Sequence, residues 1–223
     1  MQKFQISRRG MLKLVGIAAV MGSVAPAALA SSIMANELQG KRILIAYFSM
    51  PETDNQNNMT REEDNSVVVV NGKVLGNTQY VAQLIQGMTG GTIFRIEPEH
   101  PYPKDHRTLV ALAKDEQNRN ARPAISGTVD MTHYDTIFLG YPNWWADMPM
   151  VLYTFLEQYN FSGKTIIPFC THGGSGFSNT IQSIASKQPG ATVIKKGFAL
   201  SRSSMEQAPS GVAGWLKKLN LKK

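Results

Sequence analysis

Three short apolar segments, each followed by a polar or glycine-rich corner, constrain the fold of this chain more than any other feature. They cover residues 42–48, 136–140 and 164–170, and amphipathic helical patterns lie between them. Apolar runs of this length predict strands of a parallel sheet that is buried on both faces. In such sheets ligands bind beyond the carboxyl ends of the strands, where the strand order reverses. The three corners are therefore the first candidates for a binding site.

Two further strands and five helices complete the pattern. The strands are expected at 92–96 and 192–200, and the helices at about 77–89, 105–120, 148–159, 179–186 and 209–219. Repeated alternation of strand and helix predicts an α/β fold, with a parallel five-stranded sheet and helices on both faces. The sequence shows no internal repeat and no second domain, so residues 42–223 are expected to form one domain.

A long excursion, residues 50–76, separates the first strand from the first helix. Residues 50–66 are rich in Asn, Asp and Glu, which predicts a mobile loop. In the second half an Asn71-Gly72 pair lies between β-forming residues, which predicts a hairpin. This insertion is expected to act either as a lid over the site or as an interaction arm.

Residues 1–30 have the pattern of an export signal. Paired arginines, Arg8 and Arg9, precede an apolar run at 14–24 and an Ala-Leu-Ala corner at 28–30. The pair resembles a twin-arginine signal, and an ordinary secretory signal or an uncleaved anchor is the alternative. The run is shorter than the roughly 20 residues that a membrane span requires. We therefore expect an exported, periplasmic protein without a stable membrane anchor once the signal is removed, and residues 31–41 as a polar lead-in.

Charge and cysteine content exclude several classes of function. The formal net charge of +7 falls to +3 without residues 1–30, so the basic balance does not indicate a nucleic-acid partner. The single cysteine, Cys170, excludes an internal disulfide. No metal site is expected, because the four histidines lack ligand-like spacing: His100, His106, His133 and His172.

The first corner has the residue types of a phosphate site. Ser49 ends a strand, and Asn77 and Thr78 begin a helix. Helix N-termini present free N–H groups and a partial positive charge, and hydroxyl groups add donors. The alternative is that Asn77 or Thr78 only caps the helix.

The second corner carries two adjacent tryptophans, Trp144 and Trp145. A ring stacked on an indole gains roughly 0.5–1.5 kcal/mol beyond its burial. Both indoles could instead fill the core, but two consecutive loop residues do not easily both face inward. We expect at least one of them to be a platform for a flat ligand.

The third corner, residues 171–176, contains glycines that let the backbone approach a ring edge closely. Its amides are suited to the carbonyl and imide edge of an isoalloxazine, although a flexible turn is the alternative. His172 is either a proton donor to a reduced substrate or a histidine hydrogen-bonded within its loop. Cys170 is expected to behave as a small hydrophobic residue. Together the three corners predict a pocket for a flat, phosphorylated aromatic cofactor, with FMN as the candidate.

Four motifs carry a resemblance to a known family. They are Ile-Ala-Tyr-Phe-Ser at 45–49, Gly-Asn-Thr at 76–78, Gly-Tyr-Pro-Asn-Trp-Trp at 140–145 and Pro-Phe-Cys-Thr-His-Gly-Gly-Ser-Gly at 168–176. They resemble the flavodoxin-like family, in particular its small bacterial FMN-binding members, over nearly all of residues 41–219. The resemblance implies a three-layer sandwich with strand order 2-1-3-4-5 and non-covalently bound FMN.

The same resemblance implies which residues contact FMN. Ser49, Asn77 and Thr78 would contact the phosphate, and the flavin ring would lie between the second and third corners, lined by Pro142, Asn143, Trp144, Trp145, Thr171, His172 and Gly173. Two features depart from electron-carrying flavodoxins. The insertion replaces a compact Thr/Ser-rich loop, so the residue that completes the phosphate site is open, and the chain is mildly basic where such carriers are acidic.

These observations are compatible with three classes of function. The first is an oxidoreductase that reduces a small molecule such as a quinone through bound FMN. The second is a non-enzymatic electron carrier that docks to a redox partner protein. The third is a binding module without flavin.

Overall fold

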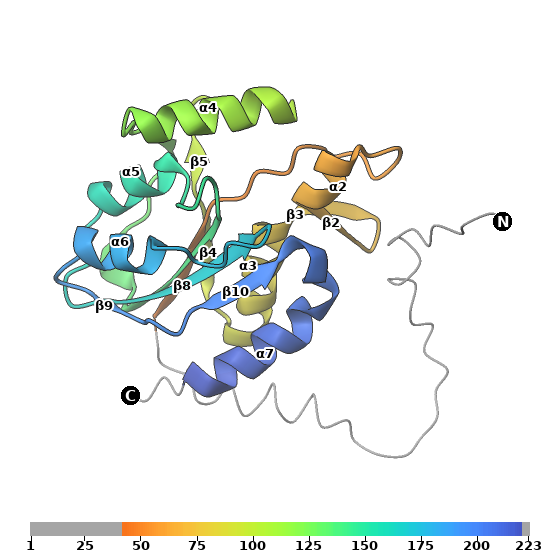
Figure 1. Ribbon diagram of the computed structural model, residues 1–223. Helices are drawn as coiled ribbons and strands as arrows, with labels where there is room; N and C mark the ends of the chain where they lie inside the picture. Colours follow the sequence, from red (N-terminus) through yellow and green to blue (C-terminus); the bar gives the residue numbers. More distant parts are fainter. Residues whose placement is uncertain (1–41, 220–223) are drawn as a thin grey trace, which may run out of the picture.

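The computed structural model describes residues 42–219, and the predicted export signal and lead-in lie outside the described residues. Figure 1 shows a central twisted sheet between two layers of helices. Every residue of β1 (Ile43–Tyr47) is buried. Its side chains alternate between the two faces: Leu44 and Ala46 belong to one apolar cluster, and Ile43 and Ile45 to the other. The expected three-layer α/β sandwich is thereby confirmed.

The sheet is parallel, with the strand order β4-β1-β7-β8-β10. The remaining bounds are β4 Thr92–Arg95, β7 Thr136–Pro142, β8 Thr165–His172 and β10 Phe198–Ser201. Numbered along the chain, these five strands have the order 2-1-3-4-5 that the resemblance implies. The order reverses between β1 and β7, so the ligand-binding edge predicted by the switch-point rule lies at the carboxyl ends of these two strands.

The prediction of one continuous strand at 192–200 was wrong. The structure has two short strands, β9 (Thr192–Val193) and β10, and both pair with β8. The Ile194 amide still donates to the Ile166 carbonyl at 2.9 Å, so Ile166 faces this edge of the sheet. Pro168, two residues further on, faces the same edge and has no N–H to donate. The ladder is interrupted there and resumes at Phe169.

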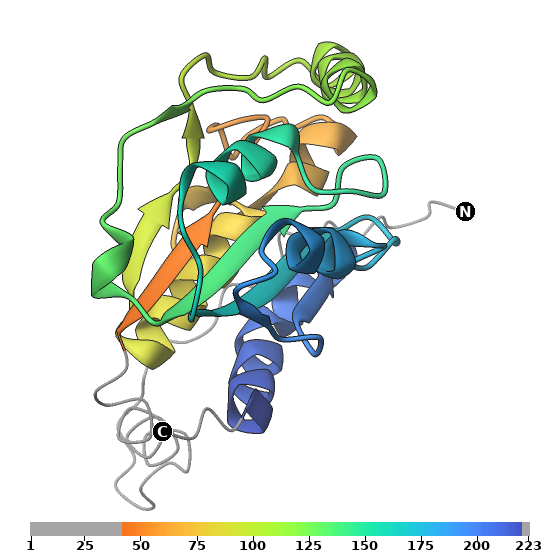
Figure 2. The same ribbon diagram turned by 90° about the vertical axis from the view of Figure 1, so that its left-hand side faces the viewer.

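The five expected helices are present. They are α3 Asn77–Thr89, α4 His106–Asn118, α5 Met150–Gln158, α6 Thr180–Lys187 and α7 Ala208–Leu219. The cluster on one face of the sheet contains buried side chains of α4, α5 and α6, and the cluster on the other face contains those of α3 and α7. Figure 2 shows the two helical layers on either side of the sheet. Among residues 42–219, no helix has the length and apolar character needed to cross a membrane.

The insertion after β1 is more ordered than the sequence suggested. The predicted hairpin is confirmed as β2 (Val67–Val70) and β3 (Lys73–Gly76), with positive φ angles of 50° and 76° at Asn71 and Gly72. The segment expected to be only a loop also contains a helix, α2 (Arg61–Ser66). Thr60 and Glu63 form a capping box, a Thr-x-x-Glu signal that the polar composition of the segment obscured.

Smaller elements connect these parts. A short antiparallel pair, β5 (Glu97–Pro98) and β6 (Ile125–Ser126), flanks α4. Two 3-10 helices, η2 (Met131–His133) and η3 (Arg202–Gln207), precede β7 and α7. η3 begins directly after the last residue of β10, so Arg202 lies at the carboxyl edge of the sheet.

Candidate functional site

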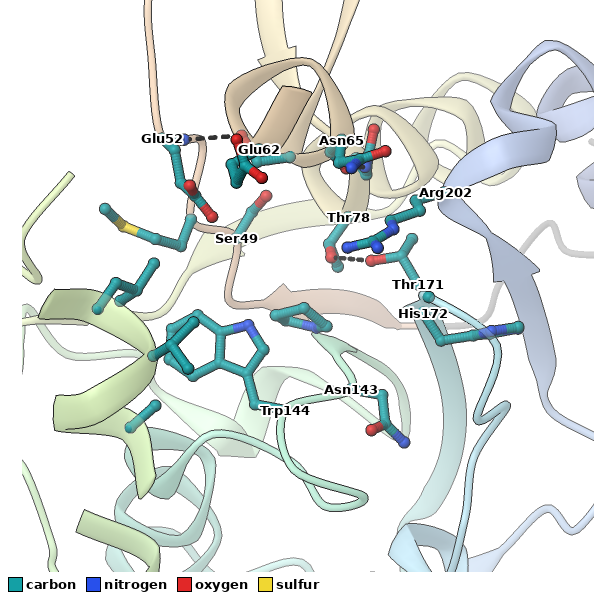
Figure 3. A pocket seen from close by; sticks show the side chains of 18 of the residues that line it. Ser49, Glu52, Glu62, Asn65, Thr78, Asn143, Trp144, Thr171, His172 and Arg202 are labelled. Carbon is teal, nitrogen blue, oxygen red and sulfur yellow. Dashed lines mark hydrogen bonds between the residues drawn. The ribbon is translucent and has the colours of Figure 1, made fainter. Parts of the chain in front are cut away.

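A single pocket at the carboxyl edge of the sheet brings together all ten residues predicted for the site. They are Ser49, Asn77, Thr78, Pro142, Asn143, Trp144, Trp145, Thr171, His172 and Gly173. Figure 3 shows several of these side chains converging from separate parts of the chain. The remaining lining residues, which the sequence did not single out, are Met50, Glu52, Glu62, Asn65, Ser66, His106, Leu109, Val110, Ala113 and Arg202.

The N-terminus of α3 is capped by a side chain from a different segment of the chain. Its N-cap residue is Gly76, so Asn77 and Thr78 are the first two helical residues and the alternative that one of them is the N-cap is wrong. The Ser49 hydroxyl accepts a hydrogen bond from the Gln79 amide at 3.3 Å and takes the place of the missing cap side chain. A Cβ on Gly76 would clash with Ser49 Oγ, so this arrangement requires glycine.

The first corner is tied to its neighbours by buried polar side chains. Asn77 Nδ2 donates to the Asn65 carbonyl of α2 at 2.8 Å. The hydroxyls of Thr78 and Thr171 are hydrogen-bonded at 2.7 Å, and the two residues are 1% and 4% exposed. This contact joins the first corner directly to the third. The amides of the first turn of α3 point away from the helix body and have no intrahelical acceptors.

The tryptophan corner is a tight, strained turn. Trp144 and Asp147 exchange two backbone hydrogen bonds of 2.8 and 3.0 Å. Between them, Trp145 and Ala146 have φ angles of 52° and 62°. Residues other than glycine adopt this left-handed region at a cost, and such strain concentrates at functional sites.

The two indoles have different surroundings. Trp144 packs edge-on against Phe48 and Tyr102, with ring centroids 5.5 Å apart in both pairs. Trp145 is 49% exposed, and its Nε1 donates to the Val110 carbonyl of α4 at 3.1 Å. Trp144 is therefore held inside the pocket by other rings, whereas Trp145 fastens the turn to α4.

The second and third corners are linked through Asn143. Its backbone N–H donates to the Thr171 carbonyl at 2.8 Å, and its side-chain Nδ2 donates to the Gly176 carbonyl at 3.0 Å. Nδ2 also contacts Ser178 Oγ at 3.1 Å. Pro142 is the last residue of β7, directly before this link. Together these bonds fix the distance between the two sides of the pocket.

His172 is hydrogen-bonded within its own loop. Its Nδ1 accepts the Gly174 amide at 3.0 Å, and burial lowers the pKa of the imidazole. A neutral ring with Nδ1 as acceptor carries its proton on Nε2. The neighbouring Cys170 is 1% exposed, and burial raises the pKa of its thiol to about 12, as expected for a small hydrophobic residue.

One wall of the pocket comes from the insertion and α4. Glu52 is 9% exposed, and His106 Nδ1 lies 3.0 Å from both of its carboxylate oxygens. Burial raises the pKa of Glu52, while the hydrogen bond from His106 acts in the opposite direction. Leu109, Val110 and Ala113 of α4 add an apolar surface. The i, i+4 spacing of Leu109 and Ala113 indicates a buried face, but nothing local indicates that this face borders a pocket.

Arg202 is the only lysine or arginine among the described residues that line the pocket. It directly follows β10, whose last residue Ser201 is paired with His172 of β8. This position after a strand end is the signal by which the sequence could have identified it.

The fold and the site define a class of protein: a doubly wound α/β protein with a polar, tryptophan-containing pocket at the switch point of its sheet. A profile of the flavodoxin family matches residues 66–219, more than half of the chain, and the chain belongs to this family. The comparison with curated proteins found no match.

Solved structures with the same fold include two proteins provisionally assigned as flavoproteins. The protein from Bacteroides eggerthii is 27% identical, with 82% of this chain and 100% of that chain covered and a TM-score of 0.60. The protein from Bacteroides uniformis is 29% identical, with 80% and 99% covered and a TM-score of 0.60. A flavoprotein from Lactobacillus acidophilus, solved in complex with FMN, is 21% identical over 77% and 99% of the chains, with a TM-score of 0.53. At that identity the last likeness concerns the fold.

Proposed function

We propose that this protein binds FMN in the pocket at the switch point and uses it for redox chemistry. The observation that carries the proposal is the convergence of three kinds of group in one pocket: a helix start, an indole and a loop rich in backbone amides. Membership of the flavodoxin family and the FMN complex of the Lactobacillus protein support it.

The residues present fit the parts of FMN. The Asn77 and Thr78 amides at the start of α3, together with the Ser49 and Thr78 hydroxyls, form a donor set suited to a phosphate dianion. Trp144, braced by Phe48 and Tyr102, offers a ring for stacking. The backbone amides of His172 and Gly173, which line the pocket, are suited to the pyrimidine edge of the flavin. Bound FMN would supply electron and hydride transfer, while the chain binds it, orients it and shields it from water.

We further propose that the protein is an oxidoreductase that reduces a small molecule such as a quinone. The pocket extends beyond the ten predicted residues to an apolar wall formed by Met50, Leu109, Val110 and Ala113. A flat apolar substrate could lie against this wall, close to the flavin. A carrier that only docks to another protein has no need of such a wall.

The test begins with the visible spectrum of the purified folded protein and the identification of any cofactor released from it. FMN and steady-state oxidation of NADH or NADPH in the presence of a quinone would support the enzyme. Bound FMN without turnover, but with electron exchange to a redox partner protein, would favour the carrier. A colourless protein that stays colourless after FMN is added would rule out both and favour a binding module.

A further inference from the structure

We propose that Arg202 makes the pocket selective for a phosphorylated flavin, because its guanidinium contacts the phosphate group. The inference rests on the proposed FMN-binding function and names a residue outside the motifs that carry the family resemblance. In this proposal Arg202 completes the phosphate site. The sequence had not identified the completing residue, because the insertion at 50–76 replaces the usual Thr/Ser-rich loop.

The backbone fixes where the Arg202 side chain begins. Ser201, the last residue of β10, is paired with His172 at the end of β8. The Ser201 hydroxyl accepts the Ser203 amide at 3.3 Å and caps η3. Arg202 therefore leaves the sheet at its carboxyl edge, immediately beside the glycine-rich third corner.

The guanidinium lies against the backbone of that corner. A Cβ on Gly173 would lie 3.2 Å from Arg202 Cζ and 3.3 Å from Nε, closer than most side-chain contacts. Figure 3 shows the side chain extending into the pocket toward Thr78 and Thr171, whose hydroxyls are hydrogen-bonded to each other. Because Thr78 is in the first turn of α3, this direction leads from the third corner to the helix start.

The guanidinium has no partner within residues 42–219, where it makes neither a hydrogen bond nor an ion pair. Within the same region Arg42 pairs with Asp135, Arg119 with Asp115 and Arg122 with Glu157. Arg61 and Arg107 also lack a carboxylate partner there, but both are exposed and neither lines the pocket. An arginine directed into a pocket without a carboxylate partner retains its donors for a ligand. Its planar fork suits two oxygens of a phosphate.

The charges that line the pocket also favour a cation beside the phosphate. Two carboxylates, Glu52 and Glu62, line it, and His106 pairs with Glu52. A helix N-terminus contributes only about half a positive charge. Without Arg202, a phosphate dianion would meet more negative than positive charge.

The experiment measures the affinities of two ligands, FMN and riboflavin, which differ only in the phosphate. Each is titrated into three apoproteins: the wild type, Arg202→Gln and the control Arg107→Gln. Arg107 is exposed on α4 and does not line the pocket, so the control changes the charge equally. We expect Arg202→Gln to weaken FMN binding by about tenfold to a hundredfold, as the loss of a charge-assisted contact predicts. Riboflavin affinity should stay within about twofold, and the control should bind both flavins like the wild type. If Arg202→Gln does not fold, Arg202→Met is measured with the same expectation.

Two results would overturn the inference alone: an FMN affinity within about twofold of the wild type, or an equal loss for FMN and riboflavin, which would place the guanidinium on the ring. A wild type that binds neither flavin would overturn the proposed function as well. Fluorescence titration of the flavins gives these affinities without any assay of activity.

Discussion

Trp144 and Trp145 are adjacent in sequence, yet the left-handed turn at Trp145 and Ala146 directs their rings to different neighbours. We predict that Trp144→Ala weakens FMN affinity by roughly tenfold or more, because the stacking surface in the pocket is lost. Trp145→Ala should change FMN affinity by less than about threefold. It should instead lower the free energy of unfolding by about 1 kcal/mol, through loss of the hydrogen bond to Val110. Flavin titration and urea unfolding measure the two effects.

This prediction distinguishes a tryptophan that stacks on the flavin, Trp144, from one that only stabilises the turn, Trp145. Trp144 also packs on Phe48 and Tyr102, so its removal will lower stability too, and Trp144→Phe serves as a control that keeps an aromatic ring. Equal and small effects of Trp144→Ala and Trp145→Ala on affinity would remove the stacking argument.

Gly76 gives a second test at the scale of single residues. Its φ of −63° is available to alanine, so the cost of Gly76→Ala is steric: the new Cβ clashes with Ser49 Oγ and displaces the cap of α3. We predict a loss of about 1–3 kcal/mol in the free energy of unfolding, measured with urea.

The same helix provides the matched control. Gly87 is exposed within α3, and a Cβ there would meet no atom within 4 Å. Gly87→Ala should therefore stabilise the protein by about 0.5–1 kcal/mol through helix propensity. If Gly76→Ala were as stable as Gly87→Ala, the Ser49 cap would have no energetic role.

At the scale of elements, Glu157 of α5 connects three segments. It accepts two hydrogen bonds from Arg122, at 2.7 and 2.9 Å, and one from Lys187 of α6 at 2.8 Å. Arg122 and, to a lesser extent, Lys187 lower the pKa of Glu157 to about 2. A carboxylate with a lowered pKa stabilises the fold above its unfolded pKa of about 4.3, and this contribution is lost as the pH falls toward 2.

We predict that Glu157→Gln is less stable than the wild type at pH 7, by less than about 1 kcal/mol because the carboxylate is partly exposed. The difference should shrink between pH 4.3 and pH 2. Thermal unfolding across this range measures it, with Glu99→Gln, an exposed glutamate outside any ion pair within residues 42–219, as the control. A difference that is constant with pH would mean that Glu157 acts by packing rather than by charge.

The elements that the sequence predicted well are those set by local pattern. The five helices follow from the spacing of apolar residues and the hairpin from the Asn71-Gly72 turn, and both are patterns among residues close together in the sequence. The division of β9 from β10 could not be predicted in this way. Its cause, Pro168, lies in a different strand and acts only through pairing.

The site shows the same division between local and tertiary information. Ser49, Trp144 and His172 stand at or just after strand ends, so the parallel-sheet rule places them at one edge without knowledge of the packing. Glu52 and Leu109 reach the pocket only because the insertion and α4 fold back over that edge. No short-range pattern encodes this contact, because the two segments are far apart in the sequence and meet through tertiary packing.

At the scale of the whole molecule, the pocket takes residues from Ser49 to Arg202 and joins strand ends that are far apart in the chain. No part of the chain can form it alone, so FMN can bind only after the domain has folded. A pathway that exports folded proteins would let the cofactor be loaded first, whereas export of an unfolded chain would require loading outside the cell membrane. The predicted twin-arginine signal is therefore compatible with a cofactor that is bound before export.

We predict that replacing both Arg8 and Arg9 by lysine abolishes export in a bacterial host and leaves the precursor in the cytoplasm with FMN bound, because the substitution spares the folded domain. Cell fractionation with immunodetection, followed by flavin analysis of each fraction, measures both outcomes. Lys3→Arg, which changes another cation of the same segment, should be exported normally. Export of the double variant at the wild-type level would show that the chain uses another route, and wild-type protein that reaches the periplasm without FMN would show that folding and loading follow export.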